Sequence, residues 1–168
     1  HVGRFVFPKN HLFLLQVLKA VLCQKENTFL LLVGEGELQE AIRQNACELG
    51  LGDRAIFTGA RKDVAKLYSA MDVFCMPSVY EGVPVVALEA QANGLPCIFS
   101  DSITAEVQLL NTKQLSLTNC HDWINAIGKM HRENEPTDLP MKYDIEYATK
   151  TMCTFYLEVC RKYDPKKT

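Results

Sequence analysis

The segment EGVPVVALEAQANG places two glutamates, Glu81 and Glu89, on either side of Pro84. Proline is favoured at the first position of a helix, so we predict that Pro84 begins a helix whose free N–H groups attract an anion. Glu89 falls on the side of that helix that carries Val85 and Ala92, where a carboxylate is costly unless another group donates a hydrogen bond to it. The segment therefore predicts an anion site flanked by two carboxylates.

Two further loops carry residues that suit a phosphorylated ligand. Arg4 and Lys9 lie close together in VGRFVFPKN and could bind phosphate as a planar fork and a point charge. Gly34 and Gly36 in VGEGELQE permit a tight turn and a close approach of the backbone to a ligand. Gln39 occupies the third glycine position of the dinucleotide fingerprint G-x-G-x-x-G, so we do not expect a nicotinamide site.

A third loop, TGARKD, contributes Arg61, and Asp63 is suited to cap the next helix. Each of these groups also has a plainer interpretation. The cations could be solvated surface groups, Glu81 an ordinary loop carboxylate, and Glu89 part of an internal ion pair or turned toward solvent. Ligand binding is favoured because all of these groups fall on one edge of the predicted sheet, and open α/β sheets bind ligands beyond the carboxyl ends of their strands.

Apolar segments and helix-length segments alternate along the chain, which predicts an α/β fold with a single Rossmann-like, open, mostly parallel sheet and helices on both faces. The expected strands are Val2–Phe7, Thr28–Val33, Ala55–Phe57, Val73–Met76 and Pro96–Phe99, with a weaker one at Gln114–Leu117. The expected helices, two of which stop at Gly50 and Gly94, are His11–Gln24, Leu38–Leu49, Val64–Met71, Val85–Asn93, His121–His131 and Asp144–Tyr163. The last helix carries an apolar stripe that we expect to pack only in part, formed by Ile145, Ala148, Met152 and Phe155.

The composition excludes several classes of protein. The 168 residues carry a net charge of −2 with a sequence pI near 6.1, so no basic field is present to hold nucleic acid. No apolar run approaches the roughly 20 residues that span a bilayer. The seven cysteines include no C-x-x-C pair and are typical of core residues in a reducing compartment, and the four histidines show no metal-ligand spacing. We expect neither a metal site nor a nucleic-acid partner.

The acidic segment resembles the retaining nucleotide-sugar glycosyltransferases of the GT-B architecture, glycosyltransferase family 4 (glycosyl transferases group 1). Two glutamates separated by seven residues are the signature of that family, and EGVPVVALEAQANGLPC matches it almost throughout. VGRFVFPKN, VGEGELQE and FTGARKDVAKLYSAMDVFCMPS resemble other donor-domain segments of the family, so the strong resemblance covers Val2 to Asp101. In these enzymes an N-terminal domain holds the acceptor and a C-terminal domain holds the nucleotide-sugar. The resemblance implies that residues 1–168 form one donor-binding domain, the C-terminal half of a GT-B enzyme.

The resemblance assigns the diphosphate of the donor to Arg4, Lys9 and the backbone N–H groups of Gly82 and Val83. Members of the family transfer sugar with retention at the anomeric carbon, usually without a bound metal, and positive groups stabilise the charge that develops on the leaving diphosphate. Glu81 would contact the donor sugar near the reacting carbon. Glu81, Arg4 and Lys9 are thus the expected catalytic residues.

The resemblance assigns the nucleoside of the donor to other loops. Glu89 would accept hydrogen bonds from the ribose hydroxyls, Ala60 and Arg61 would contact the base, and the turn at Gly34 would adjoin the nucleotide. Glu37 stands where proline is common in the family, which should alter only the entry to the following helix. Uridine diphosphate is the nucleotide that we expect.

The implied partners are a nucleotide-sugar donor, with no separate cofactor, and an acceptor sugar or lipid-linked glycan held by an N-terminal domain that is absent from this chain. The sequence of the motif is most similar to that of bacterial enzymes of exopolysaccharide, capsule or lipopolysaccharide synthesis. This similarity implies a cytoplasmic hexosyltransferase whose full-length form is peripheral at the cytoplasmic face of the inner membrane. The chain starts without Met and shows no targeting segment, and we interpret it as a piece of a longer protein that folds alone but does not transfer sugar.

Two other functions remain open. A GT-B epimerase or phosphorylase half would share the sheet but handle a different leaving group, although the lysine context of a phosphorylase cofactor is not found. A non-catalytic nucleotide-binding or interaction module of flavodoxin-like shape would use the carboxylates only for stability. Binding of uridine nucleotides, compared with flavin and nicotinamide cofactors, separates the glycosyltransferase from the flavodoxin-like module.

Overall fold

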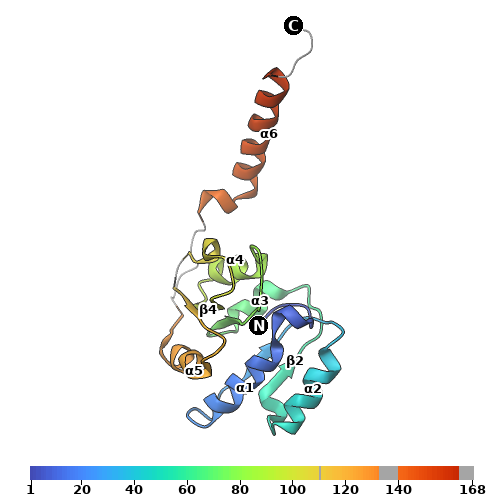
Figure 1. Cartoon of the computed structure of the whole chain (residues 1–168), viewed down its shortest axis with the longest axis vertical. Helices are drawn as coiled ribbons and strands as arrows, with labels where there is room; N and C mark the ends of the chain where they lie inside the picture. Colours follow the sequence, from blue (N-terminus) through green and yellow to red (C-terminus); the bar gives the residue numbers. More distant parts are fainter. Residues whose placement is uncertain (110, 133–139, 163–168) are drawn as a thin grey trace. The chain divides into compact units, whose positions relative to one another are not determined.

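The computed structural model describes residues 1–109, 111–132 and 140–162. The chain divides into two compact units, His1–Thr137 and Asp138–Thr168, and each is described by itself (Figure 1). The first unit contains every residue of the predicted ligand site. The second unit contains the last predicted helix.

The first unit alternates parallel strands with helices, which confirms the predicted α/β class. Its strands are β1 (Leu30–Leu32), β2 (Ala55–Phe57), β3 (Phe74–Met76), β4 (Cys97–Ser100) and β5 (Thr112–Leu115). Its α-helices are α1 (His11–Leu22), α2 (Gln39–Glu48), α3 (Val64–Ser69), α4 (Val85–Ala92) and α5 (Cys120–Lys129). Hydrogen bonding divides the strands into two sheets, β1-β2 and β3-β4-β5, and every pair is parallel.

The first three residues of the chain contact both sheets. The amine of His1 donates to the Leu31 carbonyl at 2.9 Å, and Val2 forms a parallel bridge with Val33 next to β1. On the other side, Nδ1 of His1 lies 2.8 Å from the Cys75 carbonyl of β3. This segment therefore lies between the two sheets and links them.

The predicted first strand, Val2–Phe7, is wrong over most of its length. After the bridge at Val2 the backbone turns, and the Val6 N–H donates to the Arg4 carbonyl at 2.9 Å. A 3₁₀ turn, η1 (Phe7–Lys9), follows directly. Phe5 is fully buried within this turn region, so its aromatic ring packs in the core although Phe5 does not belong to a strand.

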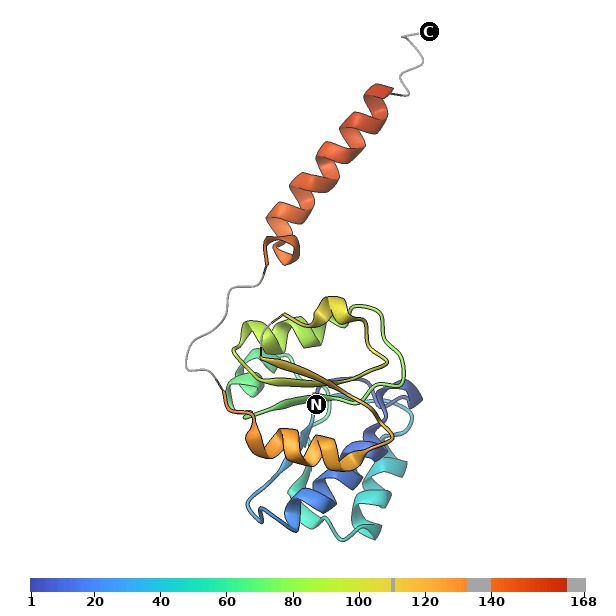
Figure 2. The same ribbon diagram turned by 60° about the vertical axis from the view of Figure 1, so that its left-hand side comes forward.

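Helices cover both faces of the strands. Phe74 and Met76 of β3 belong to a buried cluster that includes Tyr68 of α3 and residues of α4. Cys75, which points to the opposite face, belongs to a second cluster with residues of α1 and α2 and with Trp123 of α5. Figure 2 shows the yellow-green α4 and the orange α5 on opposite sides of the strands. The arrangement leaves the carboxyl ends of the strands, and the loops that follow them, at one edge.

The predicted helix stops at Gly50 and Gly94 are confirmed. Their φ angles are +70° and +73°, the left-handed conformation that glycine adopts at little cost after a helix. Pro84 differs from its prediction, because its ψ of 115° is extended and it is the N-cap residue, so α4 begins at Val85.

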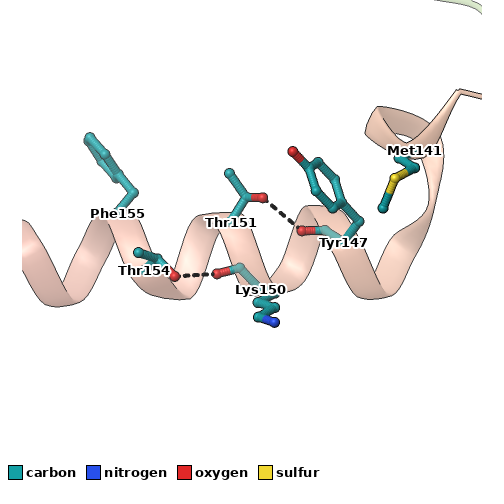
Figure 3. Close-up of a pocket in the computed structure, with 6 residues that line it drawn as sticks. All are labelled: Met141, Tyr147, Lys150, Thr151, Thr154 and Phe155. Carbon is teal, nitrogen blue, oxygen red and sulfur yellow. Dashed lines mark hydrogen bonds between the residues drawn. The ribbon is translucent and has the colours of Figure 1, made fainter.

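The second unit consists of a 3₁₀ turn, η4 (Met141–Tyr143), and the helix α6 (Ile145–Lys162). The Thr151 and Thr154 hydroxyls donate at 2.9 Å to the carbonyls of the residues four positions earlier, Tyr147 and Lys150 (Figure 3). These internal bonds satisfy both threonines within α6.

The predicted apolar stripe of α6 is mostly exposed within its unit. Ile145 is 77% exposed, and Met152 and Phe155 are 57% and 58% exposed. Ala148 is half-buried. None of the helices in the described parts of the chain combines the length and the apolar character needed to span a bilayer.

Candidate functional site

Lys9 and Glu81, two of the predicted catalytic residues, form an ion pair. Lys9 ends η1, and Glu81 lies in the loop between β3 and α4. The Val79 N–H donates to the Pro8 carbonyl at 2.8 Å, which joins the two loops. Lys9 Nζ then lies 2.5 Å from Glu81 Oε1, and the two side chains are only 16% and 19% exposed. The structure therefore brings a cation and a carboxylate together at the edge of the sheet.

The ion pair neutralises both charges in the free chain. An anionic ligand that binds Lys9 must draw the ammonium group away from Glu81 or share it. Arg4, the other predicted phosphate ligand, is exposed and forms no ion pair with any described residue. Within the described ranges, Arg4 is therefore a cation without a paired carboxylate, in the loop that also carries Lys9.

The predicted backbone donors, Gly82 and Val83, lie just before the amino end of α4. Gly82 and Val83 are exposed in the loop that enters the helix, and Pro84 caps it. The Pro84 carbonyl accepts from the Ala87 N–H at 3.0 Å. The first N–H groups of a helix have no partner within it, so this end of α4 can hold an anion.

Glu89 is exposed, and Tyr68 donates to it. The side of α4 that carries Val85 and Glu89 faces solvent, so the expectation of an apolar setting for Glu89 is wrong. The partner of the carboxylate is neither Lys nor Arg. Instead, the Tyr68 hydroxyl lies 3.0 Å from Glu89 Oε2. Burial, and then the Glu89 carboxylate, raise the pKa of Tyr68, so its hydroxyl keeps its proton and acts as the donor.

Gly34 and Gly36 allow the loop after β1 to pack against the first loop of the chain. Gly34 has a φ of +137°, and a Cβ atom there would lie 2.1 Å from the Gly3 carbonyl oxygen. A Cβ at Gly36 would lie 2.6 Å from the backbone nitrogen of Phe5. Both positions thus require glycine for backbone packing, whatever ligand adjoins them.

The third loop is joined to the second. The Gly34 N–H donates to the Gly59 carbonyl at 2.9 Å, and Glu35 Oε1 accepts from the Ala60 N–H at 3.2 Å. Ala60 and Arg61 are both exposed. They are therefore accessible to a ligand, although the Ala60 N–H already has a partner.

Arg61 is held by Asp63 through two hydrogen bonds of 2.8 Å. This pairing lowers the pKa of Asp63, chiefly through the hydrogen bonds from the guanidinium. Asp63 does occupy the predicted N-cap position of α3, but its side chain makes no capping bond because Arg61 engages it. The pair fixes the plane of the Arg61 guanidinium.

A buried histidine lies next to the Lys9 loop. His11 is 2% exposed, its ring stacks on Phe5 at 4.1 Å between centroids, and its Nε2 has no hydrogen-bond partner among the described residues. Burial, followed by the positive charges of the His1 amine and Lys9, lowers the pKa of His11 to about 4. His11 is therefore neutral near pH 7. No three His, Cys, Asp or Glu residues in the described ranges are grouped to hold a metal ion.

Sequence reasoning missed Tyr68 and Glu35, which contact predicted site residues. A signal for Tyr68 was present, since a tyrosine on the buried side of a short helix needs a partner for its hydroxyl. Glu35 sits between Gly34 and Gly36, where only the fold reveals that the third loop lies within reach.

Two curated relatives are similar to part of this chain. The chain is 48% identical over 108 residues to EpsF of Bacillus subtilis (strain 168), which is named as a glycosyltransferase, and this covers 64% of the chain and 28% of EpsF. It is 37% identical over 106 residues to the UDP-Gal:alpha-D-GlcNAc-diphosphoundecaprenol alpha-1,3-galactosyltransferase of Escherichia coli, covering 60% of the chain and 27% of that protein. The chain thus spans little more than a quarter of the length of either relative.

A solved structure shares the fold of this chain, and a known family matches its sequence. The fold is similar to the C-terminal domain of the glycosyl transferase group 1 family protein LpcC from Francisella tularensis, with a TM-score of 0.67 and 18% identity over 76% of this chain and 71% of that domain. Residues 1–133 match the family of glycosyl transferases group 1. Because this match covers well over half of its length, the chain belongs to the glycosyl transferases group 1 family.

Proposed function

We propose that this chain is the donor-binding, C-terminal half of a retaining glycosyltransferase that uses a nucleotide diphosphate sugar. The ion pair between Lys9 and Glu81 carries the proposal, because a phosphate-binding cation and a carboxylate for the sugar meet at the carboxyl edge of the strands. The name of the Escherichia coli relative includes UDP-Gal, which supports a uridine diphosphate donor.

Lys9, Arg4 and the amino end of α4 bind the diphosphate. When the donor enters, Lys9 exchanges Glu81 for phosphate oxygen, and Arg4 adds a second cation from the same loop. The N–H groups near Gly82 and Val83 face the same anion. As the bond to the sugar breaks, negative charge grows on the leaving diphosphate, and these positive groups lower the barrier by stabilising it.

The two glutamates contact different parts of the donor. Glu81, released from Lys9, lies against the donor sugar near the reacting carbon. Glu89 accepts hydrogen bonds from the ribose hydroxyls. Arg61, whose guanidinium is oriented by Asp63, contacts the base. Ala60 contributes its carbonyl and methyl groups, because its N–H already donates to Glu35.

The acceptor belongs to a domain outside this chain. The chain spans little more than a quarter of the Escherichia coli relative, whose name includes a diphosphoundecaprenol-linked sugar. We therefore assign the full protein a hexosyltransferase activity toward a sugar or lipid-linked glycan in bacterial exopolysaccharide, capsule or lipopolysaccharide synthesis. We propose that it acts at the cytoplasmic face of the membrane, where it meets such a lipid-linked acceptor. Sugar transfer needs the facing acceptor domain, so this chain alone binds donor without turning it over.

Calorimetric titration of the chain with UDP, flavin mononucleotide and NAD tests the proposal. We expect UDP to bind and the other two not to bind. Lys9→Met should weaken UDP binding by roughly 10- to 100-fold, because a charged hydrogen bond to phosphate is lost. Lys19→Met, which removes an exposed lysine of α1, is the matched control and should bind UDP like the wild type. Binding of flavin without UDP, or no effect of Lys9→Met, would contradict the proposal.

A further inference from the structure

Tyr68 reaches from the core to the surface carboxylate of Glu89. Its side chain is 2% exposed, and its ring packs edge-on against Phe74 of β3, with 5.9 Å between centroids and an interplanar angle of 74°. Its hydroxyl lies 3.0 Å from Glu89 Oε2 and 3.3 Å from the Val86 carbonyl, which precedes Glu89 by one helical turn. The phenol is therefore fixed by the core at one end and bound to α4 at the other.

An exposed glutamate has three rotatable bonds and no fixed orientation of its own. The bond from Tyr68 selects one orientation of Glu89, because its donor belongs to a buried ring that cannot follow the carboxylate. Glu89 Oε1 accepts from no described residue, so this oxygen stays open toward solvent. A carboxylate oxygen has two lone pairs, and Oε2 also retains one for a ligand.

The backbones of α3 and α4 are tied together at their carboxyl ends. The Arg132 guanidinium donates to the carbonyls of Tyr68, Ser69 and Met71, at 3.0, 3.3 and 3.2 Å. It also donates to the Asn93 carbonyl and to Asn93 Oδ1, at 2.7 and 2.6 Å. Because Tyr68 and Asn93 share this donor, the separation of the two helices is fixed, and the hydroxyl of Tyr68 stays within reach of Glu89.

We infer that Tyr68 is a positioning residue that orients the Glu89 carboxylate toward the ribose hydroxyls of the donor. This inference rests on the proposed function, in which Glu89 binds the ribose. The high pKa of the buried phenol keeps the hydroxyl protonated, so it donates to Glu89 whether or not the donor is bound. Tyr68 itself does not touch the nucleotide.

The test compares UDP with 2′,3′-dideoxy-UDP, which lacks the ribose hydroxyls, in calorimetric titrations. The wild type should prefer UDP by at least about 10-fold. Glu89→Gln should lose most of this preference. Tyr68→Phe keeps the ring but removes the hydroxyl, and it should reduce the preference by about 3- to 10-fold while the affinity for dideoxy-UDP stays unchanged. The double variant should match Glu89→Gln, because Tyr68 acts only through Glu89.

A structural role of Tyr68 gives a different result. If Tyr68 serves only the packing of the core, Tyr68→Phe weakens the binding of UDP and dideoxy-UDP alike, or weakens neither. In both cases the wild-type preference for UDP survives, and the inference is overturned. Tyr156→Phe, which removes the same atom from an exposed ring of α6, is the control and should keep the wild-type preference. If the wild-type chain does not bind UDP, the proposed function is wrong. If it binds UDP and dideoxy-UDP equally well, Glu89 does not bind the ribose hydroxyls, and the inference is wrong as well.

A second measurement uses the unaltered protein, in case Tyr68→Phe does not fold. The ¹³Cζ signal of Tyr68, recognised by its proximity to Phe74, should shift when UDP binds and should stay in place with dideoxy-UDP. No shift with UDP, in a chain that prefers UDP over the dideoxy form, would overturn the inference.

Discussion

Lys9 and Glu81 come from loops far apart in the sequence, yet their charged atoms lie 2.5 Å apart. Both side chains are largely covered, so the pair is less screened than an ordinary surface ion pair. Removal of either partner leaves the other charge without its neighbour. The binding of phosphate by Lys9 and the freedom of Glu81 to contact a sugar are therefore coupled.

Arg132 should be a main contributor to the stability of the first unit. Its guanidinium donates to carbonyls at the ends of α3 and α4, and those carbonyls would lose their partner in Arg132→Met. We expect the free energy of unfolding to fall by about 1.5–3 kcal/mol. The melting temperature should fall by roughly 2–4 °C for each kcal/mol lost. Arg61→Met removes an arginine from an exposed pair, which water screens, and should cost much less stability than Arg132→Met. Equal losses in the two variants would refute this account of Arg132.

Gly34 should tolerate no side chain. In Gly34→Ala the new methyl group meets the Gly3 carbonyl, and the φ of +137° is strained for alanine. Chemical denaturation should show a loss of about 2–4 kcal/mol. Gly128→Ala is the matched control, because Gly128 lies within α5 and a Cβ there meets no atom within 4 Å. That variant should gain about 0.5–1 kcal/mol from helix propensity, and a similar loss at both glycines would contradict the packing argument.

His11 should make the fold sensitive to acid. Its pKa falls from 6.5 to about 4 on folding, so the unfolded chain binds a proton between these values and the folded chain does not. Stability from the neutral ring is therefore complete above pH 6.5 and is lost as the pH falls toward 4, by up to about 3 kcal/mol. His11→Phe keeps a ring against Phe5 without a titrating group. Urea denaturation at pH 7 and pH 4.5 should show a smaller loss in His11→Phe than in the wild type, and an equal loss would exclude His11 as the cause.

The order of strands and helices is predictable from the sequence, because buried parallel strands are continuous apolar runs and glycines such as Gly50 and Gly94 end the helices. Glu81 and Glu89 are predictable for the same reason, since Glu81 follows β3 and Glu89 lies in the next helix, whereas Lys9 follows a predicted strand that the structure does not form. The partners of these residues are not predictable. Tyr68 meets Glu89 only through the packing of α3 on α4, and Arg132 is distant in sequence from both helices that it joins.

The first segment shows another limit of sequence reasoning. Its β-branched and aromatic residues predict a strand to Phe7, but Gly34 packs against Gly3 and Gly36 packs against Phe5, and the backbone turns between Arg4 and Val6. The two loops that meet here are distant in the sequence, so no local pattern reveals their contact.

Variants of Glu89 and Glu81 should show which part of the donor each glutamate contacts. Glu89→Gln should weaken UDP and UDP-galactose alike, by roughly 10- to 100-fold, because both ligands contain the ribose. Glu81→Gln should leave UDP affinity unchanged or slightly higher, since Lys9 is no longer held by a carboxylate, while UDP-galactose binding weakens by roughly 10-fold or more.

Calorimetric titration of Glu81→Gln with UDP and with UDP-galactose, beside the wild type, decides whether Glu81 binds the sugar. Only UDP-galactose should lose affinity. An equal loss for both ligands would contradict the assignment of Glu81 to the sugar and of Lys9 to the diphosphate.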